Sequence, residues 1–69
     1  MTEIQQRLKT LSRREHEVLN YVIEGLANKQ VADQMGITLR TVKAHRAQVM
    51  AKMRATTVAH LVALVLRAG

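Results

Sequence analysis

Residues 28–47 read NKQVADQMGITLRTVKAHRA, and this stretch decides the fold. Ala32, Gly36 and Val42 stand where two crossing helices restrict the choice of side chain. The small Ala32 lets the helices approach, Gly36 permits a turn with positive φ, and the β-branched Val42 fills the gap between the helices. Together with Ile37, which is expected to anchor the turn in the core, this spacing predicts a helix-turn-helix. The alternative is a plain corner between two packed helices.

Capping residues bound the two helices of this motif. Asn28 is expected to cap the open amides of the first helix, which ends at about Met35. Thr38 is expected to cap the second helix, which runs from about Leu39 to Arg54. The positions predicted to face the core are Val31, Ala32 and Met35 in the first helix and Val42, Val49 and Met53 in the second.

Two further helices flank the motif. Ser12 and Glu15 form a capping box at the start of one of them, and Gly25 is expected to end it in a left-handed conformation. The other covers about residues 58–68, after a short connection. Residues 1–10 are interpreted as a linker remnant or a short helix. The prediction for residues 11–69 is therefore an all-α fold, a compact four-helix domain.

The charge of the chain is divided unevenly. Its 69 residues carry a formal charge of +6, and all five acidic residues lie in the first 33. After Asp33 there are six basic residues and no acid. A segment of one sign points to a polyanionic partner, either nucleic acid or an acidic membrane surface, and the alternative is a solvated basic face.

The residues needed for catalysis or metal binding are missing or scattered. Ser12, the only serine, is used as a cap, and the three glycines are isolated. His16, His45 and His60 fall on different predicted helices, so we expect no enzyme activity, no cofactor and no metal ion. The longest apolar run, residues 61–66, is far shorter than the roughly 20 residues that cross a bilayer. Without cysteines or a signal-peptide pattern, a cytoplasmic location is expected.

The second motif helix has a face suited to double-stranded DNA. With Val42 directed at the core and about 100° per residue, the opposite face presents two cations around three alanines. Small residues let a helix lie deep in the major groove, where alanine methyls can touch thymine methyls and Lys43 can reach guanine acceptors. The residues of this face are Lys43, Ala47, Arg40, Ala51 and Ala44.

Phosphate contacts are expected beside this face. His45 and Arg46 flank the core stripe and are predicted to reach the two DNA backbones, and Arg40 is predicted to bind phosphate without regard to sequence. Lys29, at the start of the first motif helix, is placed for another phosphate, helped by the open amides there. Lys52 is equally consistent with an ordinary solvated residue.

The last predicted helix is apolar nearly all round. Val58, Leu61, Val62 and Val65 are expected to cover the body of the domain. A helix apolar on both sides normally has two buried faces, and a small domain offers no second layer. We therefore expect the outer face to pack against the same helix of a second copy, through Ala63 and Leu64 with His60 and Arg67 beside them.

The successive blocks LSRREHEVL, EGLANKQVA, GITLRTVKAHRAQVMAKM and AHLVALVLRAG resemble, in order and spacing, the LuxR/FixJ-type helix-turn-helix. The resemblance covers Leu11 to Gly69 and is closest to the FixJ-like branch. It implies the output domain of a two-component response regulator, which binds double-stranded DNA as a homodimer and contacts RNA polymerase to regulate transcription. In full-length relatives of this kind a receiver domain precedes it.

The resemblance also implies roles for single residues. Base contacts fall on Lys43, Ala44 and Ala47, and backbone contacts fall around Lys29, Thr41 and His45. Ala27 departs from the family pattern, in which this position is often a capping Ser or Thr, and Ala47 stands where some relatives carry a cation.

Three other readings remain open from the sequence. A promoter-reading domain of a sigma factor shares part of the pattern, but the long apolar last helix favours the LuxR type. A protein-interaction module that has lost DNA binding would be favoured by an acidic recognition helix, and residues 39–54 contain no acid. A membrane-surface helix over residues 58–67 would need charge along one face, whereas its charge lies at one end.

Overall fold

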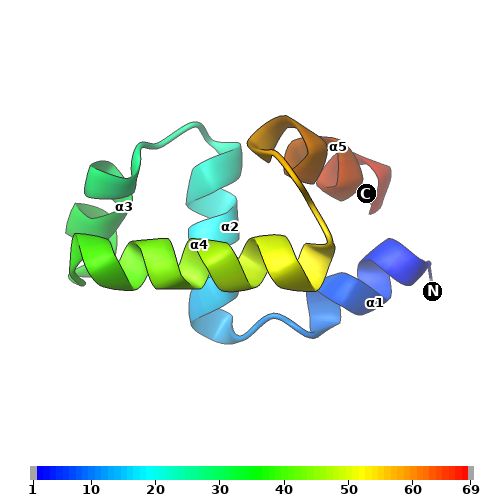
Figure 1. Cartoon of the computed structure of the whole chain (residues 1–69), viewed down its shortest axis with the longest axis horizontal. Helices are drawn as coiled ribbons and strands as arrows, with labels where there is room; N and C mark the ends of the chain where they lie inside the picture. The colour runs from blue at the N-terminus through cyan, green and yellow to red at the C-terminus, as the bar shows by residue number, and fades with distance from the viewer. Residues whose placement is uncertain (1, 69) are drawn as a thin grey trace.

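The computed structural model describes residues 2–68 and consists of five helices. They are α1 (Glu3–Lys9), α2 (Arg13–Ile23), α3 (Asn28–Met35), α4 (Leu39–Met53) and α5 (Val58–Ala68). In Figure 1, α4 lies across the front of the molecule and α2 crosses behind it, α3 lies beside one end of α4, and α1 and α5 extend beyond the other end. The all-α prediction is confirmed, but the count of four helices is wrong, because residues 3–9 form a helix of their own. Gly69, the last residue of the predicted domain, lies outside the described residues.

Local hydrogen bonds explain why α1 is helical. The Thr2 hydroxyl accepts the Gln5 amide at 3.1 Å, and the Gln5 side chain accepts the Thr2 amide at 3.0 Å, which completes a capping box. Glu3 in the first turn and Arg7 in the last turn complement the helix dipole. The two apolar residues of α1, Ile4 and Leu8, pack against the core.

The bounds of α2 follow its predicted caps. The Ser12 hydroxyl accepts the Glu15 amide at 3.1 Å, and the Glu15 carboxylate accepts the Ser12 amide at 2.7 Å. After Ile23 the chain turns at Gly25, whose φ is +89°. The amide of Leu26 then donates to the carbonyl of Tyr21, as in a Schellman ending.

One hydrophobic core lies between α2, α3, α4 and α5. It holds all three of the residues predicted to face inward from α4. Burying apolar side chains supplies most of the stability of such a domain, at about 25 cal/mol per Å² removed from water. The fully buried side chains are Val18, Val31, Val42, Val49, Met53 and Leu61.

The orientation of α5 differs from the prediction. Leu64 is buried, with 5% of its surface exposed, whereas Val58, expected to face inward, is 40% exposed. The physical reason is α1, which packs against both α4 and α5 and supplies the second layer that four helices alone would lack. The placement of Leu64 on an outer face is therefore wrong.

Polar contacts fix α1 at the ends of α4 and α5. The Arg7 guanidinium donates to the carbonyl of Met53 at 3.2 Å, and the Lys52 ammonium donates to the carbonyl of Thr10 at 3.3 Å. The Gln5 amide group donates to the carbonyl of Ala68 at 3.1 Å. Two of these carbonyls belong to the last turns of α4 and α5, where helical carbonyls lack a partner within their own helix.

Within residues 2–68 no single helix has both the length and the composition needed to cross a bilayer. Helices α4 and α5 reach that threshold only as a pair, and the chain bends by 56° between them.

Candidate nucleic-acid interface

The N-terminus of α3 has no side-chain cap. Ala27 stands at the cap position and carries no acceptor, although the Gln30 side chain accepts the Ala27 amide at 2.8 Å. Asn28 is the first helical residue, and its side-chain oxygen accepts from Arg46 at 2.7 Å. The expectation that Asn28 caps α3 is therefore wrong. The amides of the first turn of α3 are left without a side-chain acceptor, and the exposed Lys29 stands beside them.

The turn between α3 and α4 depends on one glycine. Gly36 adopts φ 66° and ψ 34°, and its amide donates to the carbonyl of Ala32. A Cβ at Gly36 would meet no atom within 4 Å, so the left-handed backbone rather than crowding favours glycine here. Ala32 is buried close to the turn, and Val42 is buried on the facing helix.

Helix α4 begins where the prediction placed it. The Thr38 hydroxyl accepts the amide of Thr41 at 3.1 Å, and the two hydroxyl oxygens lie 2.9 Å apart. Thr41 is half-buried in this arrangement. The helix ends at Met53, one residue earlier than expected, because Arg54 adopts a left-handed conformation with φ 56°.

The face of α4 opposite the core is exposed. It carries small side chains between two cations, and α4 contains no acidic residue. Lys29 of α3 is exposed as well, and His45 is half-buried at the flank of α4. The exposed residues on this face are Arg40, Lys43, Ala44, Ala47 and Ala51.

The basic residues of this face are not neutralised within the domain. Among residues 2–68, the ion pairs join side chains of α1, α2 and the C-terminal end of α4. None of them includes Lys29, Arg40 or Lys43. The acidic residues of the first half of the chain therefore form no ion pair with the cations on the exposed face of α4 or at the start of α3.

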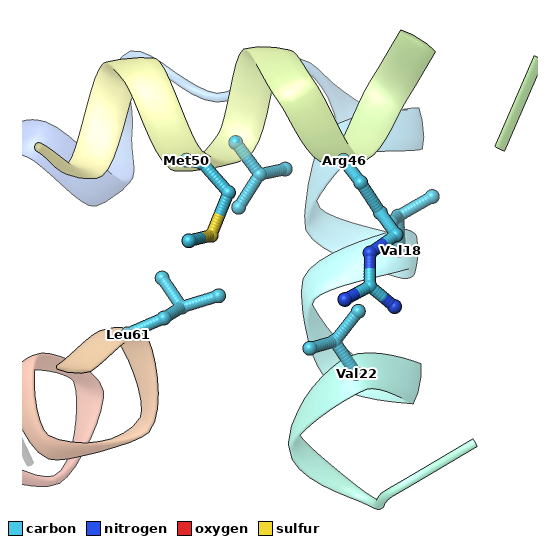
Figure 2. A pocket seen from close by; sticks show the side chains of 6 residues that line it. Val18, Val22, Arg46, Met50 and Leu61 are labelled. Atoms are coloured by element: carbon cyan, nitrogen blue, oxygen red, sulfur yellow. The ribbon is translucent and has the colours of Figure 1, made fainter. Parts of the chain in front are cut away.

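Arg46 lies elsewhere than predicted. Figure 2 shows its side chain leaving α4 and extending along α2 past Val18 toward Val22. Its guanidinium donates to Asn28, so it joins α4 to the start of α3. Because this half-buried side chain is directed at α2, the geometry does not fit a phosphate contact by Arg46.

The cavity beside Arg46 is too small for a ligand. Its volume is about 10 Å³, roughly enough for a single water molecule. Among residues 2–68, no group of three or more His, Asp or Glu side chains is arranged to hold a metal ion. The residues that line the cavity are Val18, Val22, Arg46, Val49, Met50 and Leu61.

An ion pair that the sequence did not indicate joins α2 to the end of α4. The Lys52 ammonium lies 2.8 Å from the Glu15 carboxylate, which is buried. The hydrogen bond from Lys52, followed by that from the Ser12 amide, lowers the pKa of Glu15 below its ordinary value of 4.5. Glu15 and Lys52 are 37 residues apart, so no local spacing could reveal the pair. This bond joins the start of α2 to the C-terminal end of α4.

The residues expected at a dimer interface all lie on α5 but differ in their exposure. His60 is exposed and forms two hydrogen bonds at the N-terminal end of α5. Its Nδ1 accepts the Thr56 amide at 3.2 Å, and its own amide donates to the Thr57 hydroxyl at 3.0 Å. Arg67 is exposed and Ala63 is half-buried. Leu66, which the prediction did not include, is 73% exposed and is the most exposed large apolar side chain described.

Comparisons with known proteins agree with this geometry. Residues 9–65 match the GerE model, described as "Bacterial regulatory proteins, luxR family". The transcriptional regulatory protein FixJ of Rhizobium meliloti is 51% identical over 67 residues, which cover 97% of this chain and 33% of that protein. The C4-dicarboxylate transport transcriptional regulatory protein DctR of Rhodobacter capsulatus is 51% identical over 47 residues, covering 68% of this chain and 24% of that protein.

Two solved structures share the fold. The response regulator StyR superposes with a TM-score of 0.92 at 42% identity, covering 94% of this chain and 33% of StyR. Full-length FixJ from B. japonicum superposes with a TM-score of 0.89 at 43% identity, covering 97% of this chain and 33% of FixJ. The chain spans about a third of the length of these relatives.

An exposed basic helix presented by a helix-turn-helix defines a DNA-binding domain of a transcription regulator. The chain belongs to the luxR family of bacterial regulatory proteins.

Proposed function

We propose that this domain is the output part of a two-component response regulator and places α4 in the major groove of double-stranded DNA. The observation that supports this best is the exposed face of α4, where Arg40 and Lys43 surround small alanines and no internal ion pair takes up either cation. Long side chains would hold a helix away from the base edges, whereas alanines allow close approach. The cytoplasm is the compartment in which such a regulator would meet DNA.

Within this proposal the residues divide into two groups. Lys43, Ala44 and Ala47 contact base edges, because they lie on the exposed face of α4 within its first nine residues. The residues proposed to contact the sugar–phosphate backbone are Lys29, Arg40, Thr41 and His45. Lys29 is supported by the first-turn amides of α3, which Ala27 leaves uncapped and which suit a phosphate oxygen.

We also propose that two copies pair through α5 when both are bound to DNA. Because Leu64 is buried, the pairing face is the one centred on Leu66, and Ala59 and Ala63 lie within about 60° of it. The exposed His60 and Arg67 border this face. A two-fold pair would set two α4 helices on adjacent half-sites, and contact with RNA polymerase would follow from promoter binding.

Selection of binding sites from random duplex DNA tests the central proposal. The chain is expected to enrich one sequence and to bind it at least about 10³-fold more tightly than random duplex. Enrichment of no sequence, with equal weak binding to all duplexes, would contradict it.

A charge on α5 tests the pairing proposal. Leu66→Glu should preserve the helical circular dichroism spectrum and the affinity for a single half-site, because Leu66 is exposed. It should abolish cooperative binding to a full site with two half-sites, since a carboxylate would be buried at the pairing face. Lys9→Glu, an exposed change on α1, is the control that should leave cooperativity intact. Cooperative binding by the Leu66 variant would show that pairing uses another surface.

A further inference from the structure

Leu39 is an apolar side chain exposed at the start of α4. Large hydrophobic side chains are exposed at three described positions: Leu39 at 43%, Val58 at 40% and Leu66 at 73%. The other two belong to α5, so Leu39 is the one that lies on the helix proposed to enter the groove. Neither the core nor the pairing face of α5 explains it.

Leu39 shares a row of the helix surface with residues proposed to read bases. Side chains four residues apart are neighbours on a helix, so Leu39, Lys43 and Ala47 form one continuous row. Side chains on a helix lean toward its N-terminus, which places the Leu39 isobutyl group at the leading edge of that row. The N-terminal residues of a recognition helix are those that contact base edges.

The polar side chains next to Leu39 are already used in hydrogen bonds within the protein. The hydroxyls of Thr38 and Thr41 are engaged with each other and with the helix cap, 2.9 Å apart. An isobutyl group has no donor or acceptor, so it would desolvate the polar edges of guanine, adenine or cytosine without compensation. The thymine 5-methyl is the apolar group that the major groove offers.

We propose that Leu39 is a specificity-determining residue that contacts the 5-methyl group of a thymine next to the base contacted by Lys43. This inference rests on the proposed DNA-binding function and adds a base preference to it. The selected half-site then contains a thymine at that step, chosen by apolar contact rather than by hydrogen bonding.

Removing single methyl groups from the DNA tests the contact directly. In the duplex selected by the wild-type chain, each thymine is replaced in turn by deoxyuridine, which keeps base pairing and lacks only the methyl. One replacement next to the Lys43 position should weaken wild-type binding about fourfold, the effect of one buried methyl-sized group. Leu39→Ala should weaken binding to the all-thymine duplex and should show no further loss on that same replacement, because the contact is already gone.

Matched controls separate this contact from general effects. Val58→Ala removes apolar side-chain atoms from an exposed position on α5 outside the proposed pairing face, and it should remain as sensitive to the deoxyuridine as the wild type. The inference is overturned if the Leu39 variant and the wild type lose affinity equally at every replacement, if no replacement affects the wild type, or if the selected half-site lacks thymine. In those cases the wild type still binds DNA in a sequence-dependent way, so the proposed DNA-binding function stands and only the role of Leu39 is rejected. Absence of sequence-dependent duplex binding by the wild type would overturn both.

Discussion

Lys43 and Arg40 lie about 60° apart on the same exposed face of α4, yet their expected roles differ. Lys43→Ala should cost about 1–3 kcal/mol of binding free energy on the selected site and relax the preference at one base position. Arg40→Ala should weaken all sequences alike, because phosphates carry no sequence information. The measurement is the affinity of each variant for selected and random duplexes, with Lys9→Ala as the exposed cation outside the face. An equal loss on both duplexes for Lys43→Ala would assign Lys43 to the backbone.

Glu15 ties the stability of the fold to pH. Because the hydrogen bond from Lys52 lowers its pKa in the folded chain, the ionised carboxylate stabilises the fold above the ordinary value of 4.5. This contribution is lost as the pH falls through the lowered pKa, where the carboxylate takes up a proton. Glu15→Gln should lower the free energy of unfolding at neutral pH by about 1–3 kcal/mol. It should also flatten the decline of stability on acidification.

Urea unfolding at a series of pH values from about 7 to about 3 measures both effects. Glu24→Gln, at an exposed position that ends α2, should match the wild type at each pH. If Glu15→Gln declined as steeply as the wild type on acidification, the pH dependence would arise from other groups.

At the scale of elements, α5 contains a matched pair of leucines with opposite surroundings. Leu64 is 5% exposed and Leu66 is 73% exposed on the same helix. Leu64→Ala should lower the free energy of unfolding by about 2–5 kcal/mol, because it leaves a cavity beneath α5. Leu66→Ala should change it by less than about 0.5 kcal/mol. Thermal and urea unfolding of the isolated domain compare the two, and equal losses would mean that α5 is rotated from the position described.

The helix bounds were largely predictable because caps are local. Ser12 with Glu15, Gly36 and Thr38 each specify a helix end within four residues of chain, and the structure has the helix ends close to where these residues place them. The existence of α1 was left open, because a seven-residue helix with one narrow apolar stripe is marginal by itself. Its stability comes from packing against α4 and α5, which no local pattern reports.

The candidate interface was predictable to the extent that helical periodicity determines it. Val42 fixed the buried side of α4, and the exposed face followed from about 100° per residue. Helical periodicity could not predict that Arg46 and Lys52 bind partners within the protein. Arg46 meets Asn28 at a separation of 18 residues and Lys52 meets Glu15 at 37, so both pairs exist only in the folded chain.

At the scale of the whole molecule, ion pairing concentrates the positive charge. The formal charge is +6, but Arg7, Arg13, Arg14, Lys52 and Arg54 each lie close to a glutamate. Six cations have no such partner among residues 2–68, and three of these, Lys29, Arg40 and Lys43, lie on the exposed face of α4 and at the start of α3. A polyanion approaching the domain is therefore steered to that face.

This distribution predicts how DNA binding responds to salt. Each phosphate neutralised by a cation releases counterions, so log K should fall with log salt by about 0.9 per contact. With Arg46 engaged by Asn28, the cations Lys29, Arg40 and Lys43 leave about two to three contacts per subunit, which gives a slope of about −1.8 to −2.7. Titrating a labelled duplex with potassium chloride measures the slope. Arg40→Ala and Lys29→Ala should each reduce its magnitude by about 0.9, whereas Lys9→Ala should leave it unchanged. A flat response would contradict binding through the phosphate backbone. An unchanged slope in the Arg40 and Lys29 variants would place the phosphate contacts away from α4 and the start of α3.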